Sequence, residues 1–361
     1  SVGIGLLPLQ DSVGIRTINV VASLDTTYLA RIIGSSTRQL IGKDQGIEAR
    51  TILQFSGMPT DAATAIVDTA LLRIPITYRF KDSTGNFGLD IKRMLRSWTR
   101  DSLTWDSTNV SSLVSGVDTS FSKIISVSDS VLEIRVDAVV RKWFQDSIKL
   151  SSPYGMALVP NPFATNNNII IGCSSVYSGS TDTRPELYIV YHKDTATTRF
   201  TLKPFQQVFV ADGPLPTIAD SLFFVQAGIS HRGRLKFDLT TIPKQASITS
   251  AKLLLTLDKT QSLRNAYTAN TLVAHLDLDG AAIPKLSSLT ATGSFANDTS
   301  TTLSVDVKSL VQQITSKNQN YGFVLRSSSE FIAVDRYAFF SQTASDSTRR
   351  PQLNITYTIL P

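Results

Sequence analysis

The sequence predicts an all-β fold made of two tandem, jelly-roll-like antiparallel β-sandwiches, each with one short α-helix. Three observations support this prediction. The chain has 361 residues, which exceeds the usual size of one domain. One ordered series of short segments occurs twice, which is typical of a duplicated structural module. Most other segments alternate apolar and polar residues between turns rich in Gly, Asn, Asp and Ser, as half-buried strands do.

The composition agrees with strands whose outer faces are polar but uncharged. Hydrophobic residues make up 42% of the chain, which excludes a disordered protein. Charged residues reach only 18%, below the usual quarter, and Ser and Thr take their place. Because Thr is favoured in exposed strands, this balance indicates sheet surfaces.

The clearest repeated segment reads Arg-Pro-x-Leu-x-Ile-x-Tyr. It begins at Arg184 and again at Arg350. In the second copy Leu353 and Ile355 share one face, which predicts a strand that begins at its proline. A Tyr-Gly strand precedes each copy, and the spacing between its two occurrences is almost the same as the spacing between the two Arg-Pro segments.

A short amphipathic helix is predicted in each half, directly after a strand that ends in Val-Asp. The strand ends at Asp137 in the first half and at Asp306 in the second, and we expect each Asp to be the helix N-cap. The apolar residues at i, i+3, i+4 and i+7 are Val136, Val139, Val140 and Trp143 in one half and Val307, Leu310, Val311 and Ile314 in the other.

The earliest repeated pair comprises the strands at 50–55 and 233–238. Each is followed by a proline and by a strand that opens with Ala70 or Ala251. The two copies of this pair lie farther apart along the chain than the two Arg-Pro segments do, which indicates an insertion in the first copy. We therefore expect one domain at 1–192, with an N-terminal extension at 1–15, and a second domain at 193–361.

This ordered series, used twice, resembles the DNRLRE-domain family of secreted microbial β-sandwich modules. The second half matches it from 234 to 357, and in the first half Trp98 and residues 103–106 look like the tryptophan-containing segment of that family. The second half has no such Trp; Phe295 and a Ser/Thr-rich stretch stand there instead. The resemblance implies a jelly-roll-like sandwich, export to the cell surface or beyond, and similarity to carbohydrate-binding modules.

Catalytic signatures are missing from the sequence, so we expect a protein that is not an enzyme and has no cofactor. It contains no nucleophile elbow, P-loop or dinucleotide fingerprint. Its three histidines do not have zinc-site spacing. The only cysteine, Cys173, follows a run of isoleucines, which favours a buried structural thiol over a catalytic one.

Asp277 and Asp279 form the most notable acidic pair, in the segment Leu-Asp-Leu-Asp-Gly. At positions i and i+2 of a strand they share one face. Three interpretations remain: paired carboxylates for polysaccharide cleavage, a Ca²⁺ site, and a polar strand face that runs into a glycine turn. The third is favoured, and Ca²⁺ is the one metal considered.

Trp98 and Trp105 are the candidate sugar-stacking residues, with Arg96 and Arg100 nearby to meet a carboxylate. The alternative is that both rings pack in or against a sandwich core, since each ring has a large apolar area.

The first residues form an apolar segment, with Val2, Ile4, Leu6, Leu7 and Leu9 as candidate assembly residues. Such a segment can add a strand to the open sheet edge of an identical subunit. The alternative is an ordinary first strand of its own chain.

The charge pattern narrows the range of partners. The net charge of +6 is scattered without a Lys/Arg run, so nucleic acid is not expected, and no apolar run is long enough for a membrane span. The leading hypothesis is a non-catalytic extracellular or cell-surface structural protein, a self-assembling subunit of a surface layer, sheath or filament. The alternative is a protein that binds a matrix or cell-surface polysaccharide, and the third hypothesis is a polysaccharide-degrading enzyme.

Overall fold

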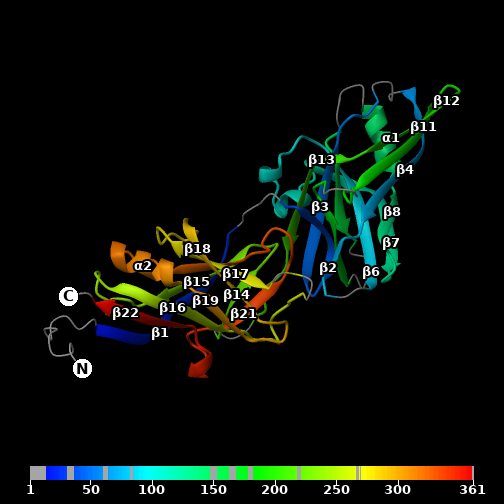
Figure 1. Cartoon of the computed structure of the whole chain (residues 1–361). Coiled ribbons are helices and arrows are strands. Elements are labelled where there is room, and N and C mark those ends of the chain that lie inside the picture. The colour runs from blue at the N-terminus through cyan, green and yellow to red at the C-terminus, as the bar shows by residue number, and fades with distance from the viewer. Residues whose placement is uncertain are drawn as a thin grey trace, which may run out of the picture. The chain divides into compact units, whose positions relative to one another are not determined.

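The computed structural model is built almost wholly from antiparallel strands, which confirms the predicted all-β class (Figure 1). It describes residues 14–30, 36–59, 64–81, 84–146, 153–161, 168–177, 182–217, 221–265, 268 and 270–359. The chain divides into two compact units. Unit 1 comprises 1–30, 215–330 and 335–361, and unit 2 comprises 31–214 and 331–334.

Unit 2 pairs a small sheet with a larger one. The small sheet has the order β12-β11-β4-β8, and the larger one has the order β5-β10-β2-β3-β9-β6-β7 with β13 paired to β3. The small sheet comprises β4 (Ile66–Pro75), β8 (Val131–Arg135), β11 (Glu186–Lys193) and β12 (Ala196–Leu202). The larger sheet comprises β2 (Arg38–Asp44), β3 (Ile47–Phe55), β5 (Tyr78–Arg79), β6 (Gly85–Met94), β7 (Val114–Ile125), β9 (Met156–Pro160), β10 (Ile169–Ser174) and β13 (Pro204–Asp212).

Unit 1 repeats much of this plan. Its order is β18-β17-β20-β15-β1-β22-β16-β19, with β14 and β21 paired beside β15. The strands are β1 (Gly14–Leu29), β14 (Leu222–Gln226), β15 (His231–Phe237), β16 (Ser247–Thr256), β17 (Thr271–Asp277), β18 (Leu286–Ser294), β19 (Thr302–Asp306), β20 (Phe323–Ser327), β21 (Arg336–Phe340) and β22 (Gln352–Ile359). β1 continues from the sheet of β22 into the sheet of β15.

Each unit has one α-helix at the predicted place, α1 (Asp137–Asp146) and α2 (Lys308–Lys317). The predicted apolar stripes are buried in both helices. The expected N-caps are wrong: Asp137 accepts a hydrogen bond from the N–H of Ala70 instead, and the N-cap of α2 is Val307. Asp306 lies one residue earlier and accepts from the N–H of Lys308 (3.1 Å).

The register of the preceding strands explains this difference. β8 pairs Ile134 with Leu72, and β19 pairs Val305 with Leu253, so Ile134 and Val305 are equivalent. The two Val-Asp segments are therefore offset from each other within the module, and their aspartates occupy different positions in it.

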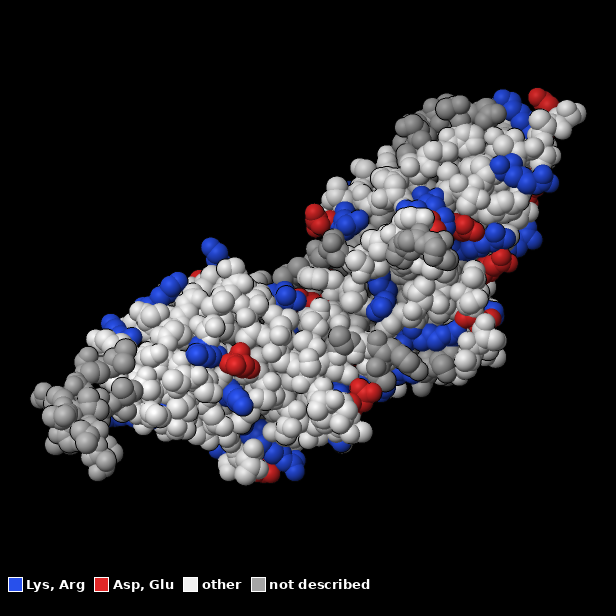
Figure 2. Space-filling view, viewed as in Figure 1, with Lys and Arg blue, Asp and Glu red and all other residues white. Residues whose placement is uncertain are grey.

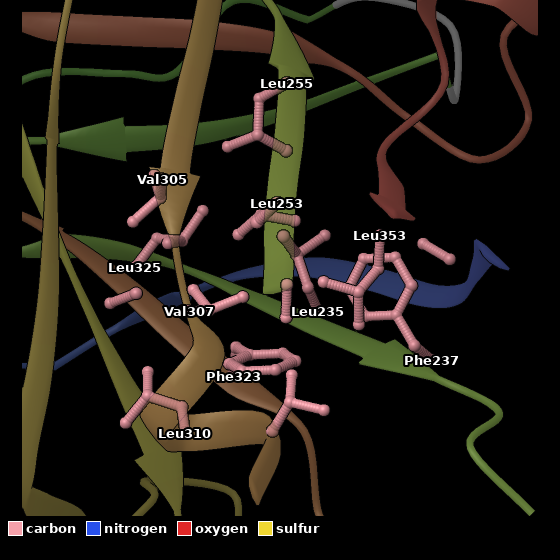
Figure 3. Packing of buried hydrophobic residues seen from close by; sticks show 14 of the residues in the cluster. Leu235, Phe237, Leu253, Leu255, Val305, Val307, Leu310, Phe323, Leu325 and Leu353 are labelled. Atoms are coloured by element: carbon pink, nitrogen blue, oxygen red, sulfur yellow. The ribbon is translucent and has the colours of Figure 1, made fainter. Parts of the chain in front are cut away.

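Each unit has a large apolar core. In unit 1 the buried side chains of Figure 3 converge from β15, β16, β19, α2, β20 and β22. In unit 2 the core includes Trp143 of α1 and Cys173 of β10. Cys173 is fully buried, and burial raises its pKa to about 12, which agrees with the structural interpretation of this thiol.

The units do not follow the expected boundary between residues 192 and 193. β12 and β13 lie beyond that boundary, yet they pair with β11 and β3 of unit 2. β1 lies near the start of the chain, yet it pairs with β22 and β15 of unit 1. Because strand pairing joins segments distant in sequence, each unit takes a strand from the other half of the chain.

Backbone conformation and close packing require the glycine of the repeated Tyr-Gly motif. Gly155 and Gly322 have φ values of +104° and +106°, a region that L-residues rarely adopt. A Cβ at Gly155 would overlap the carbonyl oxygen of Leu53, and one at Gly322 would overlap that of Leu235. The glycine therefore allows the start of β9 or β20 to approach the neighbouring strand.

We expect Gly322→Ala to destabilise unit 1 by ~1–3 kcal/mol, because the added methyl group must displace backbone. Urea unfolding followed by circular dichroism measures the change. Tryptophan fluorescence serves as an internal control, since all three Trp residues lie in unit 2. Gly14→Ala is the matched variant in unit 1, because nothing lies within 4 Å of its Cβ position. Equal stability of the two variants would contradict the steric explanation.

Candidate functional site

The most distinctive site is the part of unit 1 where β1 pairs with β22 and β15. The first half of β1 pairs with β22 from Gly14↔Ile359 to Val21↔Gln352. The second half pairs with β15 from Ala22↔Phe237 to Leu29↔His231. A register shift between Ala22 and Leu24 separates the two halves. One strand thus completes two ladders of unit 1.

Apolar side chains of β1 add little to this pairing. Ala22 is the only residue of β1 in the buried core, while Ile18 and Val20 pack partly against it. Ile15 remains 72% exposed. The core side chains labelled in Figure 3 all come from other elements. Backbone hydrogen bonds therefore dominate the attachment of β1.

A few polar contacts fix the register of β1. The Oγ1 atoms of Thr17 and Thr356 lie 3.1 Å apart. The hydroxyl of Thr27 accepts from the N–H of Phe224 at 2.7 Å. The carboxylate of Asp25 accepts from the N–H of Gln342, and burial raises the pKa of Asp25 above its usual value.

β12 and β13 occupy the equivalent place in unit 2. Leu202 of β12 pairs with Leu187 of the first Arg-Pro strand, as Val20 of β1 pairs with Leu353 of the second. Pro204 of β13 pairs with Phe55 as Ala22 of β1 pairs with Phe237. Val20 and Leu202 are separated along the chain by the same distance as Ala22 and Pro204, so a single offset relates the two strands.

Even the irregularity of the two strands coincides. β13 has its register shift between Pro204 and Gln206, and β1 has its shift between Ala22 and Leu24. The same offset along the chain relates these two positions. β1 and β12–β13 are therefore the same strand of the duplicated module. Sequence comparison missed this pair because the two segments share almost no residue types.

A loop at 95–113, which we call the tryptophan loop, covers the outer face of the larger sheet in unit 2. Trp98, Leu103 and Leu113 form a second apolar cluster with residues of β3, β9 and β13. Val208 and Val210 of β13 belong to this cluster and are buried. The loop thereby anchors β13 through its side chains.

The predicted sugar-binding residues take different positions in this loop. Trp98 is 7% exposed, and its Nε1 donates to the carbonyl oxygen of Tyr154 at 2.7 Å. Trp105 is half-buried, with the guanidinium of Arg50 3.7 Å from its ring centre. Arg96 is exposed and Arg100 is half-buried. The structure favours the packing interpretation for Trp98, and sugar binding by these residues remains a prediction.

Arg50 and Arg232 occupy equivalent positions of β3 and β15 but have different partners. Arg50 donates to Thr108 and Asn109 at 2.7 Å, which holds the tryptophan loop. Arg232 forms a two-pronged ion pair with Glu330 at 2.8 and 2.9 Å, and both side chains are buried. A buried cation requires such a partner, because an unpaired charge there is strongly destabilising.

The acidic pair at the end of β17 forms a turn. The carboxylate of Asp277 is buried, lies 2.5 Å from Arg234, and accepts from the N–H of Gly280 at 2.8 Å. Asp279 accepts from the N–H groups of Ala281 and Lys285, which lower its pKa. These contacts are those of the polar glycine turn, and they provide no support for Ca²⁺ or polysaccharide cleavage.

The remaining predictions concern metals, membranes and charge. Within the described ranges no group of three or more His, Cys, Asp or Glu side chains could hold a metal ion. No helix among the described residues is both long and apolar enough to cross a membrane. On the face shown in Figure 2, Lys and Arg are dispersed among uncharged residues, as the sequence predicted. The candidate assembly residues Val2, Ile4, Leu6, Leu7 and Leu9 lie outside the described residues.

Asp335 is a buried titratable group of unit 1. One carboxylate oxygen accepts from the N–H of Asn265 at 2.6 Å, while the other is buried without a hydrogen-bond partner. Burial raises the pKa of Asp335 from 3.8 to about 6. The arrangement is a structural support for the segment before β21.

Two solved structures overlap most of the chain at low similarity. The structure of infectious bursal disease virus Gt strain covers 98% of this chain and 80% of that chain, with 7% identity and a TM-score of 0.14. The infectious bursal disease virus VP2 subviral particle covers 98% and 78%, with 8% identity and a TM-score of 0.13. Such TM-scores do not indicate a shared fold. Neither a protein-family model nor a curated protein matches the chain.

We expect Trp98→Ala to destabilise unit 2 by ~3–5 kcal/mol, because it leaves a cavity under the tryptophan loop. Trp98→Phe keeps a ring but loses the bond to Tyr154, so its cost is ~1 kcal/mol. Urea unfolding followed by the fluorescence of Trp143 and Trp105 measures both. An unchanged midpoint for Trp98→Ala would show that the ring has no packing role.

The contribution of Asp335 to the stability of unit 1 should decrease as the pH rises toward 6. The pKa of Asp335 is about 6 in the folded chain and 3.8 as a model value, so the folded state binds the proton more tightly. Its contribution is therefore greatest below pH 3.8 and is lost as the pH rises through 6. Asp335→Asn should remove this dependence, which urea midpoints between pH 4 and 7, read by circular dichroism, would reveal. Parallel pH profiles of the variant and the parent protein would contradict the assignment.

Proposed function

We propose that this chain is a non-catalytic structural protein of an extracellular or cell-surface assembly, a subunit of a surface layer, sheath or filament. One observation carries the proposal: each of its two modules is completed by the first strand of the other half of the chain. Unit 1 is therefore discontinuous in sequence, and its first strand is attached to the rest of it mainly by strand pairing.

Strand completion of this kind suits an assembly protein. Without β1, unit 1 would expose the unpaired N–H and C=O groups of β22 and β15, and such edges recruit further strands. The bonds that fill the edge come from the backbone, so they depend little on the side chains of the incoming strand. A chain built from such modules has a ready means of joining subunits.

The proposed location rests on the sequence. The ordered segments, which occur twice, resemble secreted sandwich modules. In the structure the two copies of these segments form corresponding strands of the two units. Charged residues make up only 18% of the chain, which suits contact with neighbouring subunits. We do not propose carbohydrate binding, because Trp98 is buried and Arg50 covers one side of the Trp105 ring.

The purified chain should form oligomers or filaments as its concentration rises. Light scattering over a concentration series, with negative-stain microscopy of the largest species, measures this directly. A protein that stays monomeric at the highest soluble concentration, at both low and physiological salt, would overturn the proposal.

A further inference from the structure

We propose that β1 of one copy of this protein docks on β22 and β15 of a second copy, forming the ladders that its own β1 forms in the structure. This inference rests on the proposed structural function and names the contact through which subunits join. The partner is a second copy of this chain, and the joining segment is Gly14–Leu29.

The first argument is the connectivity of β1. It belongs to unit 1 by pairing, but the next strand along the chain is β2 of unit 2. The body of unit 1 starts only at 215, far along the chain. Release of β1 from unit 1 therefore breaks backbone hydrogen bonds but interrupts no hairpin or loop of that unit.

The second argument is the order of strands along the chain. In unit 2 the strand that follows the Arg-Pro-x-Leu-x-Ile-x-Tyr strand, β12, pairs with it directly through a turn at Asp194. β12 and β13 form the first strand of the second module. By pairing with β11 and β3, this strand completes the first module. β22 is the equivalent of β11, and the β1 of another copy would continue the same order from β22.

The third argument is how weakly side chains anchor β1. Val208 and Val210 of β13 are buried under the tryptophan loop. Their counterparts in β1, related by the same offset along the chain, are Thr26, which is exposed, and Tyr28, which is half-buried. The strand that stays within its hairpin is thus fixed by an apolar cluster, while the strand without a hairpin relies on its ladder.

Exchange leaves the ladder itself unchanged. The same pairs, from Gly14↔Ile359 to Leu29↔His231, form whether the strand comes from its own chain or from a neighbour. Whether the groups of β22 and β15 pair with β1 of their own chain or of a neighbour then depends on two quantities. These are the protein concentration and the effective concentration of the tethered strand. A head-to-tail contact of this type gives a ring if it closes and a filament if it does not.

Two single-cysteine variants test the exchange. Thr17→Cys and Thr356→Cys are prepared separately, mixed at assembling concentration and oxidised, since their Oγ1 atoms lie 3.1 Å apart in the docked ladder. Neither chain can form this disulfide alone, and the native Cys173 is fully buried. A disulfide-linked dimer on a non-reducing gel, in higher yield than from the control mixture, is the expected result, because a strand docked across copies holds the two thiols close together.

A matched pair in unit 2 provides the control. Val190 and Arg199 are cross-strand neighbours at the same position of the β11–β12 hairpin. A mixture of Val190→Cys and Arg199→Cys should form no such dimer, because a short turn keeps β12 on its own β11. Equal dimer yields from the two mixtures would overturn the inference, since random collision would explain both.

The double variant Thr17→Cys/Thr356→Cys tests whether release of β1 is required. Oxidised within one chain, it should lose the assembly seen by light scattering, and reduction should restore it. Assembly of the oxidised, intramolecularly linked protein at the level of the unmodified chain would overturn the inference. If the unmodified chain assembles while the mixed variants form no dimer, strand exchange fails and the proposed function stands. If the dimer forms while the unmodified chain stays monomeric, strand exchange stands and the proposed function fails.

Discussion

The structure depends on one backbone interaction, the pairing of a long strand with two strands of the module that it completes. In each unit that strand continues from one sheet into the other across a register shift at the same position. It satisfies donors and acceptors that would otherwise face solvent along two sheet edges. Because the strand comes from the other half of the chain, neither half of the sequence contains a whole unit.

The two units stabilise the outer face beside this strand in different ways. In unit 2 the tryptophan loop buries the face under apolar side chains, and Arg50 holds the loop through Trp105 and Thr108. In unit 1 the equivalent Arg232 is buried against Glu330. The first arrangement fixes β13 by packing. The second satisfies a charge but adds little apolar contact to β1, whose side chains stay largely exposed.

The sequence predicted those parts of the fold that local pattern determines. The Arg-Pro strands, the Tyr-Gly strands and the two helices appear where the repeat placed them, because alternation, helical spacing and an obligatory glycine leave a trace in the residues. The predicted equivalence of Asp137 and Asp306 as helix N-caps was wrong. Asp137 bonds to a neighbouring strand and Asp306 to its own turn, and the residue type alone does not distinguish these roles.

The strands that each unit takes from the other half of the chain, β1 and β12–β13, were missed for a different reason. Their position follows from pairing with segments far along the chain, and backbone pairing places almost no demand on residue type. The Trp residues were ambiguous because an irregular loop buries Trp98, and no periodic pattern marks such a loop. The identity of β1 and β12–β13 became visible only from the ladders, through the single offset that relates their partners and their register shifts.

The residues of β1 also reflect a balance between docking and aggregation. An exposed edge strand with many apolar side chains would pair with any available edge. β1 carries Arg16, Asn19 and several threonines among its polar positions, and the polar contacts of Thr17 and Thr27 favour a single register. Specificity of this pairing therefore comes from the register shift and a few hydroxyl contacts, while the affinity comes mainly from the backbone. A strand with these properties completes unit 1 and remains chemically suited to pair with β22 and β15 of another copy.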